Sequence, residues 1–275
     1  MSLILKRNLK NLLKRYQIHP LKKLGQNFLI DKSAIKKIIK AAEIGADDII
    51  LEIGPGLGNL TQELAKKTKK VIAIEKDPKM VEILKETLKD LKNIKIIKND
   101  ILKINPACDI PNTKYKLVGN LPFYLTAPLI RKFLELKNPP KEMILVVQKE
   151  VGQRICAKPP RMSILAISVQ IYAKPEIVSY ISKKSFWPQP KVDAALIKIT
   201  PCAKLSLAQR SDLFFKIVKA GFSQPRKQLI NNLSKKLNIE RNRVRNWLLK
   251  NKIQPTQRAE TLSIEDWINL TKTLK

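Results

Sequence analysis

Cysteine and histidine are scarce in this chain, and their scarcity excludes several kinds of site. Only three of the 275 residues are cysteine. They form no CxxC pair, so neither a disulfide framework nor a zinc site is expected, and a reducing, cytoplasmic setting is indicated. The single histidine, His19, has no companion ligands near it in the sequence. We therefore expect no bound metal and no Ser–His catalytic triad.

Acidic residues are also few, and long apolar runs are missing. The 23 Asp and Glu residues stand against 54 Lys and Arg residues, which gives a formal net charge of +31. The basic residues are spread along the whole chain. This predicts a polyanionic partner such as a nucleic acid, because each phosphate that a cation neutralises releases counterions. Compositional drift toward lysine is the alternative explanation for part of the excess. No apolar run is long enough to span a membrane.

The spacing of apolar residues predicts an α/β fold. Short apolar, β-branched segments alternate with segments of helical periodicity. Strands are expected at residues 47–54, 71–77, 93–100, 115–121 and 143–150, and helices at residues 33–42, 59–67, 78–91, 127–136 and 162–172. Such alternation is typical of βαβ units. It predicts a Rossmann-like fold with a parallel sheet covered on both faces.

The pattern changes after Pro201, where strands give way to helices alone. Amphipathic helices are expected at residues 207–222, 227–237, 241–251 and 263–274. We therefore expect two domains, a Rossmann-like domain over residues 1–203 and a small all-α domain over residues 204–275.

A glycine-rich segment joins the first predicted strand to its helix. In LEIGPGLGNLT, residues 51–61, Gly54 and the two glycines that follow permit a tight turn and the close approach of a ligand. Asn59 stands where a dinucleotide fingerprint needs its third glycine, and no P-loop lysine follows. Glu52, just before the turn, suits a cationic ligand better than a pyrophosphate. The turn therefore favours S-adenosylmethionine over NAD.

Two later carboxylates fit the same cofactor. Glu75 ends the second strand about 20 residues beyond the glycines, where a doubly wound fold places an acceptor for ribose hydroxyls. Asp100 ends the third strand, in a position to contact the cofactor's adenine. Ligands of open α/β sheets bind outside the carboxyl ends of the strands. The two residues and the glycine turn therefore predict one cofactor site.

The fourth strand leads into the segment GNLPF, residues 119–123. An exocyclic amine is a poor nucleophile, since its lone pair is delocalised into the ring. The Asn120 side-chain oxygen and the Pro122 carbonyl can accept its hydrogens and hold the nitrogen in line with a methyl donor. The Phe123 ring can stack on a base turned out of its helix. The segment therefore predicts a target-base site.

Taken together, these motifs resemble those of the ribosomal RNA adenine dimethyltransferases, and specifically the small-subunit (KsgA-type) branch of that family. The matches run in family order over nearly the whole chain after residue 20. They are KKLGQNFLID (22–31), LEIGPGLGNLT (51–61), IEKD (74–77), Asn99-Asp100, GNLPF (119–123), VQKEVGQRI (147–155), FWPQPKVDAAL (186–196), FSQPRKQLINNL (222–233) and RAETLSIEDW (258–267).

The resemblance implies a role for each of these site residues. In the family, the positions that bind S-adenosylmethionine correspond to Asn27, Leu29, Gly54, Glu75, Asp100 and Asn120. Asn120 would also bridge cofactor and target amine, beside Pro122. Phe123 and Phe186 would flank the target adenine, although the family usually has Tyr where Phe123 stands.

The resemblance also implies a reaction and a partner. The expected activity is dimethylation of two adjacent adenosines near the 3′ end of small-subunit ribosomal RNA, within an assembling subunit, by a monomer. The basic stretch of residues 1–16 is interpreted as an RNA-facing helix or lead, with a transit peptide as the alternative. A large-subunit adenine dimethylase of the macrolide-resistance type and a non-catalytic RNA-binding assembly factor remain the rival functions.

Overall fold

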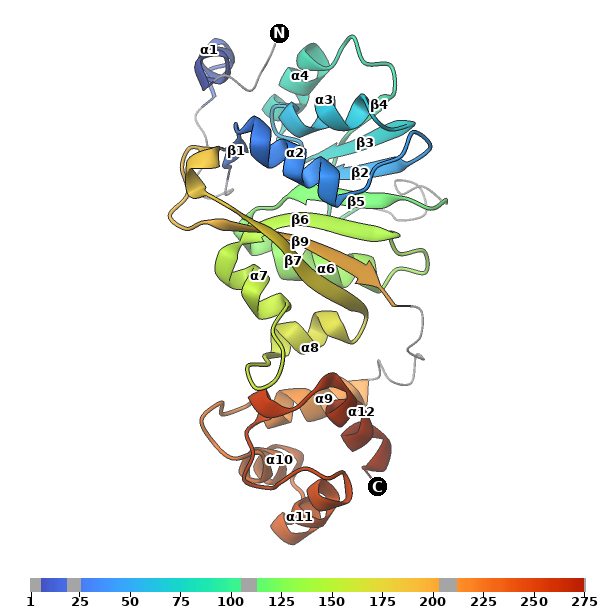
Figure 1. Cartoon of the computed structure of the whole chain (residues 1–275), viewed down its shortest axis with the longest axis vertical. Coiled ribbons are helices and arrows are strands. Elements are labelled where there is room, and N and C mark those ends of the chain that lie inside the picture. The colour runs from blue at the N-terminus through green and yellow to red at the C-terminus, as the bar shows by residue number, and fades with distance from the viewer. Residues whose placement is uncertain (1–5, 19–25, 105–112, 203–211, 275) are drawn as a thin grey trace. The chain divides into compact units, whose positions relative to one another are not determined.

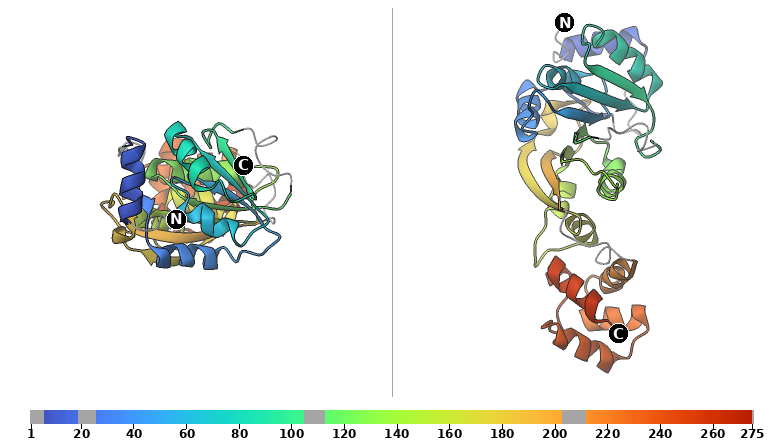
Figure 2. Two further views of the ribbon diagram at one scale, coloured as in Figure 1. Left: turned by 90° about the horizontal axis from the view of Figure 1, so that it is seen from above. Right: turned by 90° about the vertical axis from the view of Figure 1, so that its right-hand side faces the viewer.

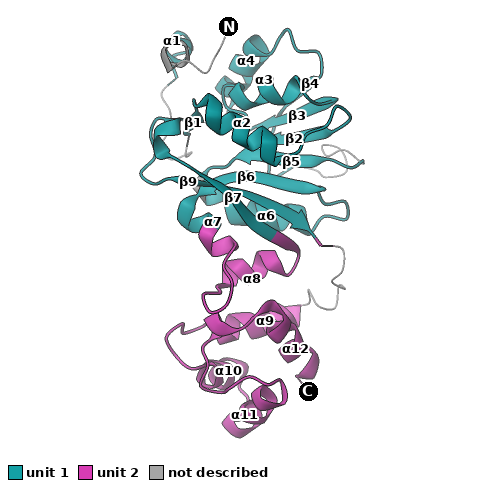
Figure 3. Cartoon of the chain, viewed as in Figure 1, with its two compact units in different colours: residues 1–152, 175–201 teal, residues 153–174, 202–275 magenta. Residues whose placement is uncertain are grey.

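The computed structural model describes residues 6–18, 26–104, 113–202 and 212–274, with the backbone alone for residues 6–10 and Phe123. The chain divides into two compact units, which are coloured separately in Figure 3. Unit 1 comprises residues 1–152 and 175–201, and unit 2 comprises residues 153–174 and 202–275. The expected boundary between residues 203 and 204 falls outside the described residues.

Seven strands of the described residues form one sheet at the centre of unit 1. Its order is β4-β3-β2-β5-β6-β9-β7, and the bounds are β2 (Ile49–Ile53), β3 (Lys70–Glu75), β4 (Ile94–Lys98), β5 (Lys116–Asn120), β6 (Glu142–Gln148), β7 (Ala173–Ile181) and β9 (Ala194–Pro201). The strands from β4 to β6 pair in parallel. Their order therefore reverses between β2 and β5, which is the switch point at which doubly wound folds bind ligands.

Helices cover both faces of this sheet, as the two views of Figure 2 show. The helices of unit 1 are α1 (Lys6–Arg15), α2 (Lys32–Ala41), α3 (Asn59–Ala65), α4 (Pro78–Thr87), α6 (Thr126–Leu134) and α7 (Lys149–Ile155). The last of them continues into unit 2. Strands covered on both faces are expected to be apolar throughout, and β2, β3 and β6 are buried along nearly their whole length. The predicted Rossmann-like fold is thus confirmed.

The far edge of the sheet differs from the prediction of a parallel sheet. β9 runs antiparallel to β6, with Ala194 paired to Gln148, and β7 lies beyond it. Neither strand was predicted. Lys174 and Glu176 alternate with less exposed residues along β7, as suits an edge strand with one solvated face, and Pro175 obscures that pattern in the sequence. β6 also ends at Gln148, where the expected strand continued to residue 150.

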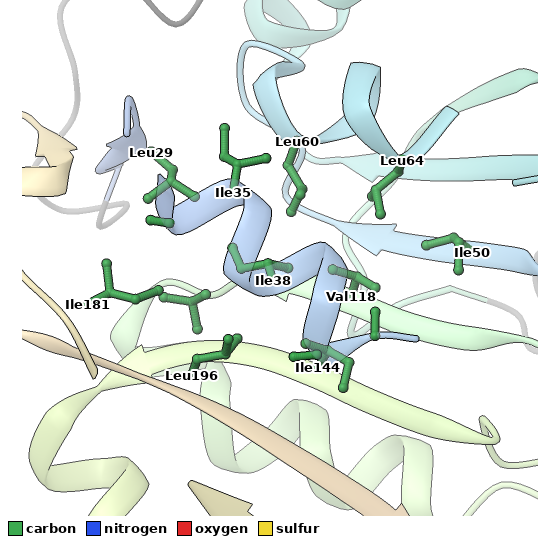
Figure 4. Packing of buried hydrophobic residues seen from close by; sticks show 14 of the residues in the cluster. Leu29, Ile35, Ile38, Ile50, Leu60, Leu64, Val118, Ile144, Ile181 and Leu196 are labelled. Carbon is green, nitrogen blue, oxygen red and sulfur yellow. The ribbon is translucent and has the colours of Figure 1, made fainter. Parts of the chain in front are cut away.

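Helix α2 anchors residues 26–31, here called the N-terminal segment, to the sheet. Asp31 caps the helix by accepting a hydrogen bond from the Ser33 N–H. The buried side chains of Ile35 and Ile38 belong to one apolar cluster with Val118 and Ile144 of the sheet (Figure 4). Burial of each such isoleucine stabilises the fold by about 1.5–3 kcal/mol. The segment that precedes α2 is therefore held firmly against the carboxyl ends of the strands.

Unit 2 is helical over its described residues. Its helices, labelled in Figure 1, are α8 (Ile164–Gln170), α9 (Asp212–Gly221), α10 (Leu229–Leu237), α11 (Arg241–Lys250) and α12 (Ile264–Thr273). Trp267 is fully buried, and its ring centroid lies 5.7 Å from that of Phe222. Ser263 and Asp266 form a capping box that starts α12. The predicted all-α C-terminal region is confirmed for residues 212–274, while residues 207–211 of its first helix lie outside the described residues. No helix that the structure describes is long and apolar enough to cross a membrane.

Lys116 provides a test of the packing at the opposite end of the strands. Its buried ammonium group donates to the Ala42 and Glu43 carbonyls at the end of α2 and pairs with Asp48 at 3.0 Å. Lys116→Ala leaves these acceptors without their donor, so we expect the free energy of unfolding to fall by about 2–4 kcal/mol. The control Lys66→Ala removes only an exposed ion pair with Glu63 and should cost less than about 1 kcal/mol. Urea denaturation of both variants measures the difference, and equal losses would contradict this role.

Candidate cofactor and target-base site

The carboxyl ends of the parallel strands open into a cavity of about 530 Å³. The cavity lies entirely within unit 1, at the switch point between β2 and β5. Seven of the residues predicted from the sequence line it: Asn27, Leu29, Gly54, Glu75, Asp100, Asn120 and Pro122. The structure therefore brings the predicted cofactor residues together around one space that is large enough for a small ligand.

The glycine turn has the backbone geometry that the sequence suggested. Gly54 and Gly56 have φ angles of +65° and +58°, a region that side chains other than that of glycine rarely adopt. A Cβ atom on Gly56 would lie 3.1 Å from the Phe28 ring. The Gly54 N–H donates to the Ile74 carbonyl at 3.0 Å. The turn is therefore fixed to β3 and leaves its ligand-facing side free of side chains.

Glu75 closes the end of β3 with its carboxylate held by backbone donors. Its Oε1 accepts the N–H groups of Lys76 and Asp77 at 2.8 and 2.9 Å. Its Oε2 accepts the Gly56 N–H at 3.3 Å. Burial raises the pKa of the carboxyl, and the backbone N–H donors oppose that rise. The side chain is thus oriented in advance, and its remaining lone pairs can accept hydrogen bonds from hydroxyl groups.

Asp100 lies on the same rim of the cavity, paired with a lysine. Its Oδ2 lies 2.8 Å from Lys76 Nζ, and its Oδ1 accepts the Leu102 N–H at 3.0 Å. The hydrogen bond from Lys76 lowers the pKa of the carboxyl, so Asp100 is ionised at neutral pH. Since the Lys76 side chain is 60% exposed, a ligand with an amino group can replace it as the partner of Asp100.

Glu52 is the most unusual charged residue of the cavity. It is 1% exposed, and its Oε2 has no hydrogen-bond partner among the described residues. Burial raises the pKa of the Glu52 carboxyl to about 8, and the nearby charge of Glu75 adds to the rise. A contact with the Thr61 hydroxyl opposes the rise in pKa, but a buried carboxyl without a cation beside it is costly when ionised. The cavity therefore fits a ligand that carries positive charge, as the sulfonium and ammonium groups of S-adenosylmethionine do.

Asn120 lies at the end of β5, where the N-terminal segment crosses the cavity. Its side-chain nitrogen donates to the Asn27 carbonyl at 2.9 Å. This bond leaves the side-chain oxygen available to accept a hydrogen from a ligand. The Pro122 carbonyl accepts the Leu125 N–H at 3.0 Å and keeps a second lone pair. The two acceptors predicted for an amine, the Asn120 side-chain oxygen and the Pro122 carbonyl, therefore belong to residues that line the same cavity.

Phe186 lies on a smaller second cavity that shares residues with the first. Asn27 and Asn120 line both cavities, and Phe186 lines the second. Phe186 is 4% exposed, and β8 (Phe186–Trp187) pairs with β1 (Phe28–Leu29) in antiparallel register. Phe123 begins a short 3₁₀ helix, η2 (Phe123–Leu125), but its side chain lies outside the described part of the chain. The structure thus brings Phe186 to Asn120 and leaves the predicted stacking role of Phe123 as a prediction.

Several further residues that line the cofactor cavity had no predicted role, and among them are three that carry polar groups. These three are Gln26, whose amide donates to Asp77 at 3.0 Å, Lys76, and Tyr124, which is 55% exposed. Lys76 directly follows Glu75, and Tyr124 directly follows the GNLPF segment. Their closeness to predicted site residues is the signal that could have identified them.

The backbone of the glycine turn allows a matched test. Gly56→Ala places a Cβ against the Phe28 ring at a positive φ angle, so we expect a loss of about 1–2 kcal/mol in the free energy of unfolding. Binding of S-adenosylmethionine should weaken by tenfold or more. In the control Gly45→Ala the nearest atom, an Asp48 oxygen, is 3.8 Å away, and both quantities should stay near the parent values. Thermal unfolding with and without the cofactor measures both effects, and equal behaviour of the two variants would exclude this role for the turn.

Comparison with known proteins identifies relatives over almost the whole chain. A family model described as ribosomal RNA adenine dimethylase matches residues 19–275. A protein of Dehalococcoides mccartyi named ribosomal RNA small subunit methyltransferase A is 41% identical over 260 residues, which cover 94% of this chain and 89% of the relative. A protein of Clostridium botulinum with the same name is 40% identical and covers 96% of this chain and 97% of the relative.

Solved structures agree with these relatives. A dimethyladenosine transferase from Plasmodium falciparum superposes with a TM-score of 0.73 at 28% identity, over 87% of this chain and 94% of that one. The 23S rRNA methyltransferase ErmE gives a TM-score of 0.72 at 27% identity, over 90% of this chain and 98% of that one. The chain therefore belongs to the ribosomal RNA adenine dimethylase family, and it is an S-adenosylmethionine-dependent methyltransferase.

Proposed function

We propose that this enzyme dimethylates the exocyclic amines of two adjacent adenosines near the 3′ end of small-subunit ribosomal RNA. The observation that carries the proposal is the meeting of Glu75, Asp100 and Asn120 around one cavity, with a cofactor region on one side and amine acceptors on the other. The relatives at about 40% identity, named for the small subunit, support the choice of RNA. The enzyme acts as a monomer in the cytoplasm on an assembling subunit, and it contributes to the subunit's biogenesis.

The cofactor is held by the carboxylates at the strand ends. Glu75 accepts hydrogen bonds from the ribose hydroxyls, and Asp100 accepts one from the adenine amino group in place of Lys76. Asn27 and Leu29 close the cavity from the N-terminal segment, while Gly54 leaves room for the backbone to contact the ligand. S-adenosylmethionine supplies an activated methyl group on a sulfonium, which is a good leaving group.

Positioning of the amine is the main catalytic task of the protein. The Asn120 oxygen and the Pro122 carbonyl accept the two hydrogens of the amine and direct its nitrogen lone pair at the methyl carbon. With the amine held in this way, bound S-adenosylmethionine would supply the methyl group to its nitrogen, S-adenosylhomocysteine would be the leaving group, and one proton would pass from the nitrogen to solvent. Phe123 and Phe186 flank the adenine ring. A second cycle on the same nitrogen gives the dimethylated product.

Two rival functions are less well supported. Methylation of large-subunit RNA would follow from the similarity to ErmE. The sequence identity to ErmE is 27%, however, against 41% for the relative named for the small subunit. A non-catalytic assembly factor would not need an intact cofactor site, and this chain keeps all the predicted cofactor residues on one cavity.

Methyl transfer from labelled S-adenosylmethionine to ribosomal particles tests the proposal. Small subunits that lack the modification should acquire label, recovered as dimethyladenosine, while large subunits and naked RNA should acquire little. Label in large-subunit RNA would favour the rival methylase. Cofactor binding without transfer to any substrate would favour the assembly factor.

Asn120→Ala provides the sharpest test of the transfer site. The variant loses the side-chain oxygen that orients the amine, so methyl transfer should fall by at least about 100-fold. RNA binding should stay within a few-fold of the parent, because Asn120 does not contact phosphates in the proposed complex. Single-turnover transfer and RNA binding are measured on the same preparation. Near-normal turnover would refute the proposed role of Asn120.

The raised pKa of Glu52 predicts a pH dependence of cofactor binding. Its carboxyl is protonated at neutral pH, since burial raises the pKa to about 8. A cationic ligand favours the ionised form, so binding releases a proton and affinity rises with pH up to about 8. The rise should be at most about tenfold per pH unit. Isothermal titration of the parent and of Glu52→Gln from pH 6.5 to 8.5 isolates this contribution, because the variant cannot release that proton. Parallel pH curves for the two proteins would contradict the assignment.

A further inference from the structure

An exposed aromatic side chain and a lysine are paired at the edge of the sheet in unit 1. Tyr180 on β7 is 46% exposed, and Lys149 Nζ lies 5.3 Å from the centroid of its ring. Val178, two residues before Tyr180 on the same face of the strand, is 45% exposed. A cation–π pair of this kind fixes the ring without covering all of it. The cluster of Lys149, Val178 and Tyr180 therefore presents an ordered apolar surface to solvent.

The orientation of β7 shows which face of the sheet carries this cluster. Side chains alternate between the two faces of a strand. Ile181 belongs to the buried cluster around α2, and Figure 4 shows it on that side of the sheet. Tyr180 must therefore point to the opposite face, where α7 begins with Lys149.

The cluster adjoins the small cavity that holds Asn120 and Phe186. The Lys149 N–H donates to the Asp193 carbonyl at 3.0 Å, and Asp193 lines that cavity. Gln148, the residue before Lys149, pairs with Ala194, which also lines it. The backbone of Lys149 is thus bonded to a residue that lines the small cavity.

The charges near the cluster favour an anionic partner. Lys149, Lys184 and Lys191 are cationic, and Lys184 and Lys191 are exposed. The acidic groups of these segments and of β7 are Glu150 and Glu176, which are exposed, and Asp193, whose Oδ1 already accepts the Lys183 N–H at 3.0 Å. Cations beside an exposed ring are what single-stranded RNA contacts, since bases stack on aromatic rings while lysines neutralise phosphates.

We infer that Lys149 and Tyr180 hold the nucleotide next to the target adenosine. The inference rests on the proposed function, in which two adjacent adenosines are modified in turn. While one adenosine occupies the cavity beside Asn120, its neighbour stacks on the exposed part of the Tyr180 ring. The Lys149 ammonium contacts the phosphate between them. The pair therefore serves as a second RNA subsite that keeps the strand in register for both transfers.

Variants of Tyr180 test the subsite with a matched control. Tyr180→Ala removes the stacking surface, so KM for unmethylated small subunits should rise at least about fivefold, the lower end of the range for one base–aromatic contact. Tyr180→Phe keeps the ring and should stay within about twofold of the parent. The affinity for S-adenosylmethionine and the thermal unfolding of both variants should be unchanged. A KM for Tyr180→Ala equal to that of Tyr180→Phe would overturn the inference.

An altered RNA gives an independent readout. Subunits reconstituted with an abasic nucleotide beside the target adenosine should raise KM for the parent enzyme but cause no further rise for Tyr180→Ala, since both changes remove the same contact. Additive effects would place the neighbouring base elsewhere. If the parent transfers no methyl groups to intact subunits, the proposed function itself fails. If the parent is active and all the Tyr180 variants match it, only the subsite fails.

Discussion

The burial of two carboxylates at the ends of adjacent strands is the constraint around which unit 1 is organised. Glu52 and Glu75 are 1% and 9% exposed, and no cation among the described residues forms an ion pair with either of them. Such groups are stable in a fold only when hydrogen bonds, protonation or a bound cation compensates the lost hydration. The glycine turn supplies one backbone donor to Glu75, and a raised pKa keeps Glu52 neutral. In the function proposed above, a sulfonium cofactor would supply positive charge on binding and favour the ionised form of Glu52.

A second constraint joins distant parts of the chain over the same cavity. β1 pairs with β8, so Phe28 lies opposite Trp187, and the Ser185 hydroxyl donates to Asp31 at 2.8 Å. The Asn59 side chain donates to the Leu29 carbonyl at 2.7 Å. These bonds hold the N-terminal segment between the cofactor turn and the region of Phe186. A single short segment therefore contributes to both the cofactor cavity and the smaller cavity beside Asn120.

The sequence predicted the features that local patterns determine. The apolar β-branched runs identified β2 to β6, and the residues predicted at their carboxyl ends line one cavity, because parallel strands bring those ends together. The strands β7 and β9 were missed, and the antiparallel direction of β9 depends on its pairing with β6 far away in the sequence. The two-residue β1–β8 pair is too short to leave a periodic signal. The exposed Tyr180 and Lys149 were missed for a similar reason, because only the folded sheet places one beside the other.

A crystal structure with bound S-adenosylhomocysteine tests the central claim most directly, since that claim concerns which side chains hold the cofactor. We expect the ribose hydroxyls within hydrogen-bond distance of Glu75, and the adenine amino group on Asp100 with Lys76 displaced. The amino group of the homocysteine moiety should lie on the side of Glu52, with the sulfur facing Asn120. A ligand bound outside this cavity, or with its ribose away from Glu75, would contradict the account.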